Sequence, residues 1–375
     1  MAKKIIFNNP VIVGDEIKNI NKVINQKHFS GNGYFTKKCS KWLIKNIKCK
    51  EALLVHSCTA ALEMCAILLN IKPGDEIIMP SYTFVSTANA FVLRGGKPIF
   101  VDINSKTLNI DEDLIQKVIT KKTKAIVVVH YAGVACKMDK ILSIAKKNKL
   151  IVIEDAAQGF LSKYKNKYLG SIGDLATISF HETKNIHCGE GGALLINNKK
   201  FINRAKIIRD KGTNRDKFNK NLIKKYTWVD IGSSYALSEI NCAFLHSQLI
   251  NSKKITSKRQ AIWKLYFSLF SELKNKIQLP YIPNESTNNA HIFYIVLKDI
   301  NRDKFLKLLN RKKVNAIFHY TPLHLSKMFV KKYNKKQNLK NTDFIANNLV
   351  RLPLHNNIKK SDILTAKQAV KEGLI

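Results

Sequence analysis

The chain has 375 residues, of which 45% are hydrophobic and 24% are charged. This length favours two domains over one small core, and the composition is that of a soluble globular protein. The sequence contains no apolar run of membrane-spanning length. The apolar run at residues 5–7 is too short for the core of a signal peptide, so we expect a cytoplasmic protein.

The formal net charge of +37 raises the question of nucleic-acid binding. Only eight of the 64 basic residues are arginine, although arginine leads in base readout. The lysines are spread along the chain, without an interleaved aromatic platform. We therefore expect no specific nucleic-acid partner, only weak adhesion to polyanions in low salt. The seven cysteines form no Cys-x-x-Cys pair, which favours reduced thiols.

Four short apolar runs in the first half of the chain predict strands, at residues 76–79, 97–102, 125–130 and 150–154. Residues 138–149, between the last two runs, have helical spacing. Alternation of this kind predicts an α/β fold with a largely parallel sheet covered on both faces. Ligands bind such sheets at the carboxyl ends of the strands, and Asp155 follows directly after one of them.

The pattern changes in the second half of the chain. Residues 235–273 predict one long helix, and two prolines at 280 and 283 then break the pattern. A strand at 292–297, a helix at 302–309 and an apolar run at 314–318 follow. We therefore predict a large domain over residues 1–250 and a smaller C-terminal α/β domain over 251–375.

A polar cluster, Ser57-Cys58-Thr59, opens a predicted helix. Free backbone N–H groups and hydroxyls at a helix start suit an anion such as a phosphate. The alternative is a simple capping box with Thr59 as N-cap and Leu62 in place of the usual Glu. These residues leave both readings open.

A second polar segment, which contains Phe84, follows the strand at 76–79. Phe84 has the chemistry to cover a flat ring by offset stacking, although a core aromatic is the commoner use. Asp155, with Gln158 one turn later, is either an ordinary helix N-cap or an acid that faces a ligand.

Lys184 is one of many lysines, and by number alone a solvated surface position would be expected. Its context favours another role. An apolar run at 176–179 precedes it, and a glycine-rich turn at 189–192 follows. Partial desolvation there would lower the pKa of the amine, which can then form a Schiff base with an aldehyde cofactor. Because Asp155 has the chemistry to keep a pyridine nitrogen protonated, the pair predicts pyridoxal 5'-phosphate (PLP).

Three other motifs do not reach a recognised pattern. His181-Glu182 begins a zinc-protease motif, but Asn185 stands where the second histidine belongs. His319 and His324 lack a third ligand at metal spacing. The glycines at 31 and 33 do not complete a dinucleotide fingerprint, so we expect neither a metal nor NAD.

Five segments together, at residues 31–36, 57–60, 79–91, 130–136 and 179–185, carry a specific resemblance. Over nearly the whole chain the sequence resembles the DegT/DnrJ-type PLP-dependent sugar aminotransferases. That resemblance implies PLP-dependent transferase fold type I, with a large mainly parallel sheet domain and a smaller C-terminal α/β domain. It also implies a homodimer with active sites at the subunit interface.

The resemblance implies a role for each site residue. Lys184 would hold PLP and shuttle the proton, and Asp155 would pair with the pyridine nitrogen. Phe84 and Gln158 would flank the ring. The phosphate would be held by Ser57, Cys58, Thr59 and Ser179. The nucleotide sugar would meet His181, His319, Tyr320, Lys211 and Arg215, although the last two also suit a solvated basic loop.

Within the family, the chain is most similar to the dTDP-4-amino-4,6-dideoxygalactose transaminases. Ser234 and Ala236 stand where the broader family has Asn and Arg, and Ser234 would then approach the phosphate in the neighbouring subunit. The implied reaction moves the amino group of L-glutamate to C4 of dTDP-4-dehydro-6-deoxy-D-glucose, for cell-surface polysaccharide such as enterobacterial common antigen. The alternatives are a UDP-linked or differently configured 4-keto sugar, and a non-catalytic PLP-binding regulator.

Overall fold

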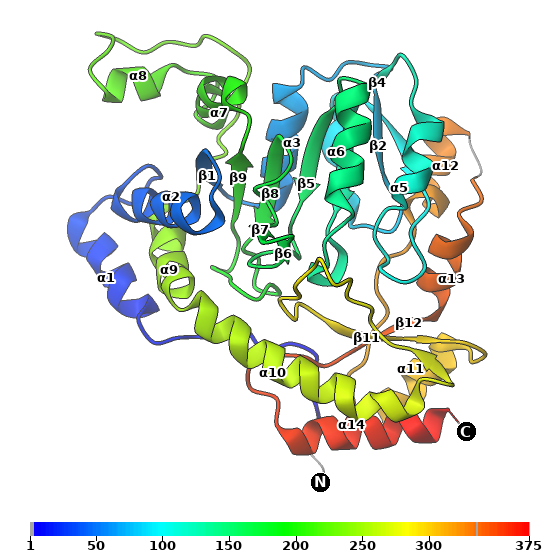
Figure 1. Ribbon diagram of the computed structural model, residues 1–375. Coiled ribbons are helices and arrows are strands. Elements are labelled where there is room, and N and C mark those ends of the chain that lie inside the picture. Colours follow the sequence, from blue (N-terminus) through cyan, green and yellow to red (C-terminus); the bar gives the residue numbers. More distant parts are fainter. Residues whose placement is uncertain (1–3, 335–336, 375) are drawn as a thin grey trace.

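The computed structural model describes residues 4–334 and 337–374. Two units lie one above the other in Figure 1, a large α/β unit and a smaller one built on α10 and α14. The α-helices are α1 (Glu16–Gln26), α2 (Tyr34–Ile47), α3 (Cys58–Leu68), α4 (Val85–Val92), α5 (Glu112–Ile115), α6 (Met138–Lys147), α7 (Ile202–Arg209), α8 (Arg215–Asn219), α9 (Glu239–Ile250), α10 (Ser252–Phe270), α11 (Arg302–Arg311), α12 (Lys327–Tyr333), α13 (Lys340–Asn348) and α14 (Lys360–Gly373).

The strands and the short 3-10 helices complete the secondary structure. The strands are β1 (Glu51–Val55), β2 (Glu76–Pro80), β3 (Lys97–Val101), β4 (Thr123–Val129), β5 (Ile151–Asp155), β6 (Lys163–Tyr164), β7 (Lys167–Tyr168), β8 (Leu175–Ser179), β9 (Gly192–Ile196), β10 (Ile277–Gln278), β11 (Phe293–Leu297) and β12 (Leu349–Leu352). The 3-10 helices are η1 (Gln116–Val118), η2 (Tyr131–Gly133), η3 (Lys199–Phe201), η4 (Ser271–Leu273) and η5 (Leu323–Leu325).

The large unit is built on a seven-stranded sheet in the order β1-β9-β8-β5-β4-β2-β3. Pairing is parallel from β8 across to β3, whereas β9 runs antiparallel to both β8 and β1. The carboxyl ends of β2, β4, β5 and β8 therefore meet along one edge. This arrangement confirms the predicted fold class and places Asp155 at that edge.

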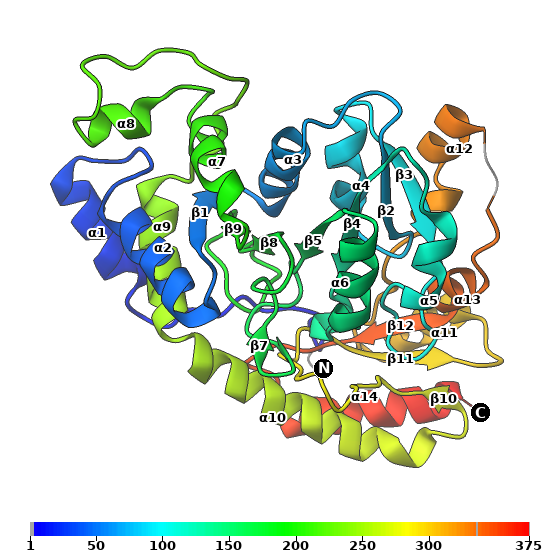
Figure 2. The same ribbon diagram turned by 45° about the horizontal axis from the view of Figure 1, so that its top comes forward.

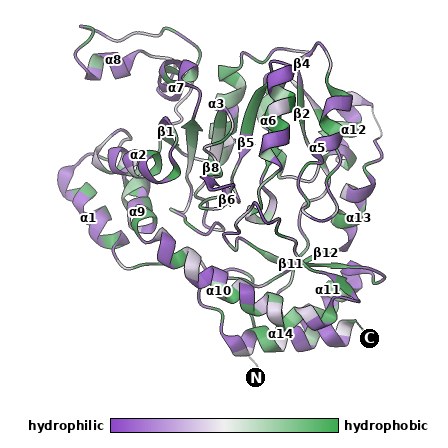
Figure 3. Cartoon of the chain, in the orientation of Figure 1, coloured by the Kyte–Doolittle hydropathy of each residue, from purple (hydrophilic) through white to green (hydrophobic). Residues whose placement is uncertain are grey.

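Alternate residues of each strand enter two different cores. Ile126 and Val128 pack with α2, α6 and α9 on one face, while Ala125 and Val127 pack with α3, α4 and α7 on the other. The strands are apolar on both faces, as a doubly covered sheet requires. Figure 3 shows these strands mostly in the hydrophobic colour, whereas α10 and α14 carry both colours.

The smaller unit is a three-stranded antiparallel sheet, β10-β11-β12, covered by α10, α11 and α14. The predicted division at residue 250 falls beside Asn251, between α9 and α10. Two details differ from that division. Ile5 bridges to Val314 and belongs to the core of the smaller unit. In the opposite direction, Phe329 of α12 and Leu339 pack with α3 and α4 in a core of the large unit.

The long helix predicted over residues 235–273 is wrong in two places. Residues 235–238 are not helical, and α9 begins after Ser238, whose side chain caps it. The backbone of Asn251, with φ −95° and ψ 2°, then separates α9 from α10. Polar side chains that compete for backbone hydrogen bonds explain both interruptions.

Two further features of the described chain bear on function. The segment around α8, residues 212–232, projects away from the body of the large unit in Figures 1 and 2. Within residues 4–334 and 337–374, no helix is both long and apolar enough to cross a membrane.

Candidate active site

A cavity of ≈ 570 Å³ lies at the carboxyl edge of the large sheet, and the smaller unit supplies part of its wall. The structure brings most of the predicted site residues together there. The predicted residues that line it are Ser57, Cys58, Thr59, Phe84, Asp155, Gln158, Ser179, His181, Lys184, His319 and Tyr320.

Lys184 enters the cavity from the loop between β8 and β9. The backbone N–H of Lys184 donates to the His181 carbonyl at 2.9 Å, and the turn is closed by Gly189, whose φ is +79°. Burial lowers the pKa of the Lys184 amine, and the Arg351 guanidinium lowers it further, whereas Asp155 acts in the opposite direction. The amine is therefore shifted toward the unprotonated, nucleophilic form.

Asp155 ends β5 and is only 5% exposed. Its Oδ2 accepts a hydrogen bond of 2.7 Å from the Thr87 hydroxyl, and its Oδ1 accepts one of 3.2 Å from Ala157 N–H. Burial raises the pKa of this carboxyl above its ordinary value, although both hydrogen bonds oppose the shift. Within the described chain no basic side chain forms an ion pair with it, so a cationic ligand group would satisfy it.

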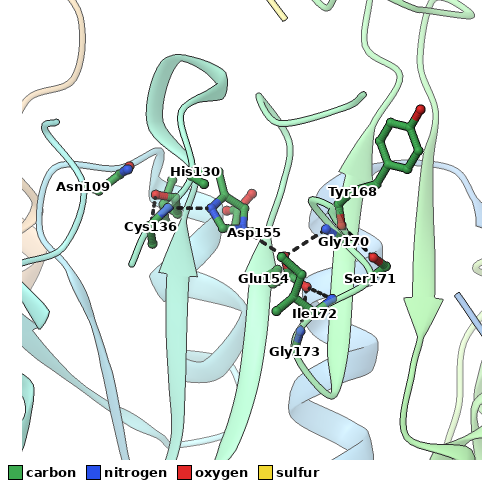
Figure 4. Close-up of polar contacts among 12 residues, drawn as sticks. Asn109, His130, Cys136, Glu154, Asp155, Tyr168, Gly170, Ser171, Ile172 and Gly173 are labelled. Carbon is green, nitrogen blue, oxygen red and sulfur yellow. Dashed lines mark hydrogen bonds and ion pairs between the residues drawn. The ribbon is translucent and has the colours of Figure 1, made fainter. Parts of the chain in front are cut away.

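Glu154, the residue that precedes Asp155, carries a second carboxylate, which is fully buried (Figure 4). Glu154 accepts backbone hydrogen bonds from Gly170, Ile172 and Gly173 at 2.7–2.9 Å, and its Oε2 lies 2.9 Å from Nε2 of His130. The other ring nitrogen of His130, Nδ1, accepts from Cys136 N–H. This network ties β4, β5 and the 170–173 loop together below the cavity.

The start of α3 faces the cavity. Ser57 is the N-cap, and its hydroxyl accepts from Ala60 N–H at 3.0 Å. The predicted alternative, with Thr59 as N-cap, is therefore wrong. Thr59 lies inside the first turn instead, and its hydroxyl donates to Ser86 at 2.8 Å. Gly192 passes so close that an added Cβ would lie 2.5 Å from Cys58 N, so only glycine permits this approach.

Gln158 and Phe84 line the cavity together with Tyr320. The Gln158 side chain accepts from Ala132 N–H at 2.7 Å and donates to the Tyr320 hydroxyl at 2.6 Å. Phe84 is 57% exposed, at the N-cap position of α4, and its ring centre lies 6.3 Å from that of Tyr320. An exposed aromatic face that lines a cavity is available for stacking on a ligand ring.

His319 is held by an aromatic group from the large unit. Its Nδ1 lies 2.6 Å from the Tyr131 hydroxyl, and its ring stacks on Tyr320 at 3.7 Å. Burial, together with the nearby Arg351 guanidinium, lowers the pKa of His319 well below its ordinary value. With the phenol as donor to Nδ1, the neutral ring carries its proton on Nε2.

Four predicted substrate or phosphate residues remain. One of them, His181, lines the cavity, and the other three lie elsewhere. His181 lines the cavity, and its Nε2 lies 3.4 Å from the Glu190 carboxylate. Ser234 is exposed and bridges to Asp210, Lys211 is exposed, and the Arg215 guanidinium lies 5.7 Å from the centre of the Tyr226 ring. The last three do not line the cavity of their own chain.

The structure also adds residues to the cavity that sequence reasoning missed, among them Thr87, Arg351, Arg259 and His291. Thr87 lies inside one of the resemblance segments, 68 residues before its partner Asp155. Arg351 follows a short apolar run near the C-terminus and carried no local signal.

A family comparison agrees with this geometry. The model of the DegT/DnrJ/EryC1/StrS aminotransferase family matches residues 10–371. The chain belongs to that family. Its sequence is 34% identical to the uncharacterised protein MJ1066 of Methanocaldococcus jannaschii over 371 residues, which cover 96% of this chain and 95% of that protein.

Solved aminotransferases have the same fold as this DegT/DnrJ aminotransferase. Helicobacter pylori PseC, an aminotransferase involved in the biosynthesis of pseudoaminic acid, has a TM-score of 0.91 and 25% identity, with 99% of both chains covered. The PLP form of the putative sugar aminotransferase Spr1654 from Streptococcus pneumoniae has a TM-score of 0.91 and 24% identity, with 99% of this chain and 100% of that chain covered.

The cofactor of this DegT/DnrJ aminotransferase is pyridoxal phosphate. The cavity fits it on three observations. Lys184 offers a desolvated amine, Asp155 a buried carboxyl that forms no ion pair with a basic side chain of residues 4–334 or 337–374, and α3 a helix start that Gly192 leaves open. The thiol of Cys58 stays neutral, because burial raises its pKa.

Proposed function

We propose that the protein transfers the amino group of L-glutamate to C4 of dTDP-4-dehydro-6-deoxy-D-glucose, giving dTDP-4-amino-4,6-dideoxy-D-galactose for cell-surface polysaccharide. The observation that carries the proposal is one cavity that is lined by Lys184 and Asp155 together with His319 and Tyr320. The first two suit amino-group chemistry, and the last two offer hydrogen-bonding groups to a polyhydroxylated substrate. The choice of this sugar rests on the resemblance to the dTDP-4-amino-4,6-dideoxygalactose transaminases. The similarity to PseC, an aminotransferase involved in the biosynthesis of pseudoaminic acid, supports a sugar substrate.

Different residues of this chain would hold different parts of the cofactor. Bound PLP supplies a protonated ring that withdraws electrons from the carbon next to the transferred nitrogen. Asp155, which Thr87 holds by a hydrogen bond, would keep the ring nitrogen protonated. The N–H groups of the first turn of α3, with the Ser179 hydroxyl, would hold the phosphate. Phe84 and Gln158 would hold the ring.

Lys184 moves the proton in both halves of the reaction. Its unprotonated Nζ would accept the proton from Cα of the donor and pass it to the cofactor, and in the second half it would carry a proton from the cofactor to C4 of the sugar. The lowered pKa of this amine favours the accepting form. His319, with its proton on Nε2, would donate a hydrogen bond to a sugar oxygen.

We further propose a homodimer in which each subunit completes the other's site. Large apolar side chains are exposed on α1 and along the projecting segment, where Ile17, Leu222 and Trp228 are 73%, 68% and 75% exposed. Both elements lie on the same side of the large unit (Figures 1 and 2). Such exposure suits an interface. Ser234, Lys211 and Arg215 would then serve the partner's cavity. Sedimentation should give twice the chain mass of 42.7 kDa.

Substrate identity is tested by comparing dTDP- and UDP-linked 4-keto-6-deoxy sugars with L-glutamate as donor. We expect faster turnover of the dTDP-linked sugar, and NMR should show an axial 4-amino group, the galactose configuration. Preference for the UDP sugar or an equatorial amine would replace the proposed substrate but keep the reaction. Absence of turnover with every keto sugar, despite bound PLP, would instead favour a non-catalytic regulator.

A further inference from the structure

Arg351 is a rigidly held guanidinium in the wall of the cavity. It lies on β12, where it pairs with Tyr294 of β11 and exchanges two backbone hydrogen bonds of 3.1 and 2.8 Å with Ile317. Its Nε and Nη2 both donate to the Phe318 carbonyl at 3.1 Å. The Phe7 ring lies 5.0 Å from the guanidinium carbon. Both the backbone and the charged group are therefore fixed before any ligand binds.

This guanidinium has no anionic partner in the described chain. Two of its five N–H bonds point to the Phe318 carbonyl, so others remain available. Neither residues 4–334 nor 337–374 supply a carboxylate that forms an ion pair with it. Arg259, the other arginine of the cavity, also lacks a carboxylate partner in the described chain, but it donates to three carbonyls, those of Ala290, His291 and Leu354, whereas Arg351 donates to one.

The Arg351 side chain is partly buried, and this burial lowers the pKa of its guanidinium. A desolvated guanidinium without a counter-ion favours an anion that can accept two parallel hydrogen bonds. Carboxylates and phosphates both do so. The question is which anion of the reaction comes close to this position.

We propose that Arg351 binds a carboxylate of the amino donor. The inference rests on the proposed function, in which an amino acid and a nucleotide sugar use one cavity in turn. The cofactor phosphate is accounted for by the start of α3. The diphosphate of a nucleotide sugar is attached at C1, across the ring from the reacting C4. The carboxylates of L-glutamate, in contrast, lie within a few bonds of the reacting nitrogen.

The electrostatics agree with a position near the reacting atoms. The Arg351 guanidinium lowers the pKa of Lys184, so the two charges act on each other. A bound carboxylate would neutralise this effect and raise the pKa of Lys184 just as that amine must take up a proton. The keto sugar carries no carboxylate, so the second half of the reaction should depend less on Arg351.

The test uses three variants of the PLP-loaded protein. Arg351→Gln removes the charge. Arg351→Lys keeps the charge but lacks the two parallel N–H donors of a guanidinium. Arg311→Gln is the control, because Arg311 is an exposed arginine at the end of α11. Loss of the visible cofactor band is titrated with L-glutamate. Its return is then titrated with the keto sugar. Calorimetry with succinate, which carries carboxylates but no amine, gives a readout without turnover.

Arg351→Gln should weaken L-glutamate and succinate binding by about 30-fold or more, with Arg351→Lys between it and wild type. Arg311→Gln should match wild type, and the keto-sugar step should change little. L-Glutamine separates the two carboxylates: equal loss for glutamine assigns the α-carboxylate, and loss for glutamate alone assigns the γ-carboxylate.

Unchanged affinity for glutamate and succinate in Arg351→Gln, or a loss confined to the keto sugar, would overturn the inference. Either result leaves the aminotransferase proposal standing. If Arg351→Gln fails to take up PLP, Arg351→Lys decides by the same titrations. A wild-type protein that takes up PLP but never responds to glutamate would remove the proposed function first, and the inference with it.

Discussion

The Tyr131 hydroxyl lies 2.6 Å from Nδ1 of His319, and so links the end of β4 to the loop that the smaller unit contributes to the cavity. Both groups keep their ordinary neutral forms, because burial raises the pKa of Tyr131 and lowers that of His319. The phenol therefore fixes the ring orientation and leaves the proton on Nε2.

Tyr131→Phe should lower kcat/KM for the keto sugar about fivefold, the effect of one neutral hydrogen bond. The loss arises because His319 is then free to place its proton on Nδ1. PLP binding and the reaction with L-glutamate should be nearly unchanged. Tyr281→Phe, at a phenol that is 48% exposed, is the control. An equal loss in both halves of the reaction would argue against a substrate-side role.

Asp155→Asn should retain PLP but slow the reaction with L-glutamate by roughly 100- to 1,000-fold. The amide keeps the size of the carboxyl and loses the charge that stabilises a protonated ring nitrogen. Stopped-flow absorbance after mixing with glutamate measures the rate. Asp299→Asn, at an exposed position, controls for loss of one charge. Wild-type rates in Asp155→Asn would show that the acid does not face the ring.

Glu154→Gln should reduce the free energy of unfolding by about 3 kcal/mol. The amide cannot accept from three backbone N–H groups and His130 at once, so buried donors lose their partner. Urea unfolding of the protein without cofactor measures the change. Glu272→Gln, at the surface ion pair with Lys367, should cause no comparable loss. Similar unfolding curves for both variants would contradict the structural role.

The difference in free energy of unfolding between wild type and Glu154→Gln should change with pH in one direction. The hydrogen bonds to its carboxylate hold the pKa of Glu154 below its ordinary value, despite the burial that opposes them. Its contribution is therefore complete above about pH 4.3, where an unfolded glutamate ionises, and is lost as the pH falls through the lower folded value. The gap between wild type and Glu154→Gln should shrink on acidification. A gap that widens below pH 4 would contradict this assignment.

Local patterns predicted the part of the site that is continuous in sequence. The apolar run before Asp155 and the glycines after Lys184 both indicated where a strand ends and a turn begins, and the structure has β5 and the β8–β9 loop there. The polar start of α3 was also predicted, although its N-cap is Ser57.

Residues joined across the fold could not be predicted in this way. Thr87 reaches Asp155, and Tyr131 reaches His319 across 188 positions, because of strand order and the docking of the smaller unit. Neither is visible in spacing or periodicity. The break at Asn251 was missed for a different reason, since one polar residue between two good helical segments gives only a weak local signal.

The most direct measurement of the central claim is the absorbance of the purified, PLP-loaded protein. A visible band should be present, L-glutamate should bleach it, and dTDP-4-dehydro-6-deoxy-D-glucose should restore it. Lys184→Ala should lack the band and the turnover, whereas Lys167→Ala, at an exposed lysine, should behave as wild type. Wild-type protein that stays colourless with added PLP, or full turnover in Lys184→Ala, would contradict the account.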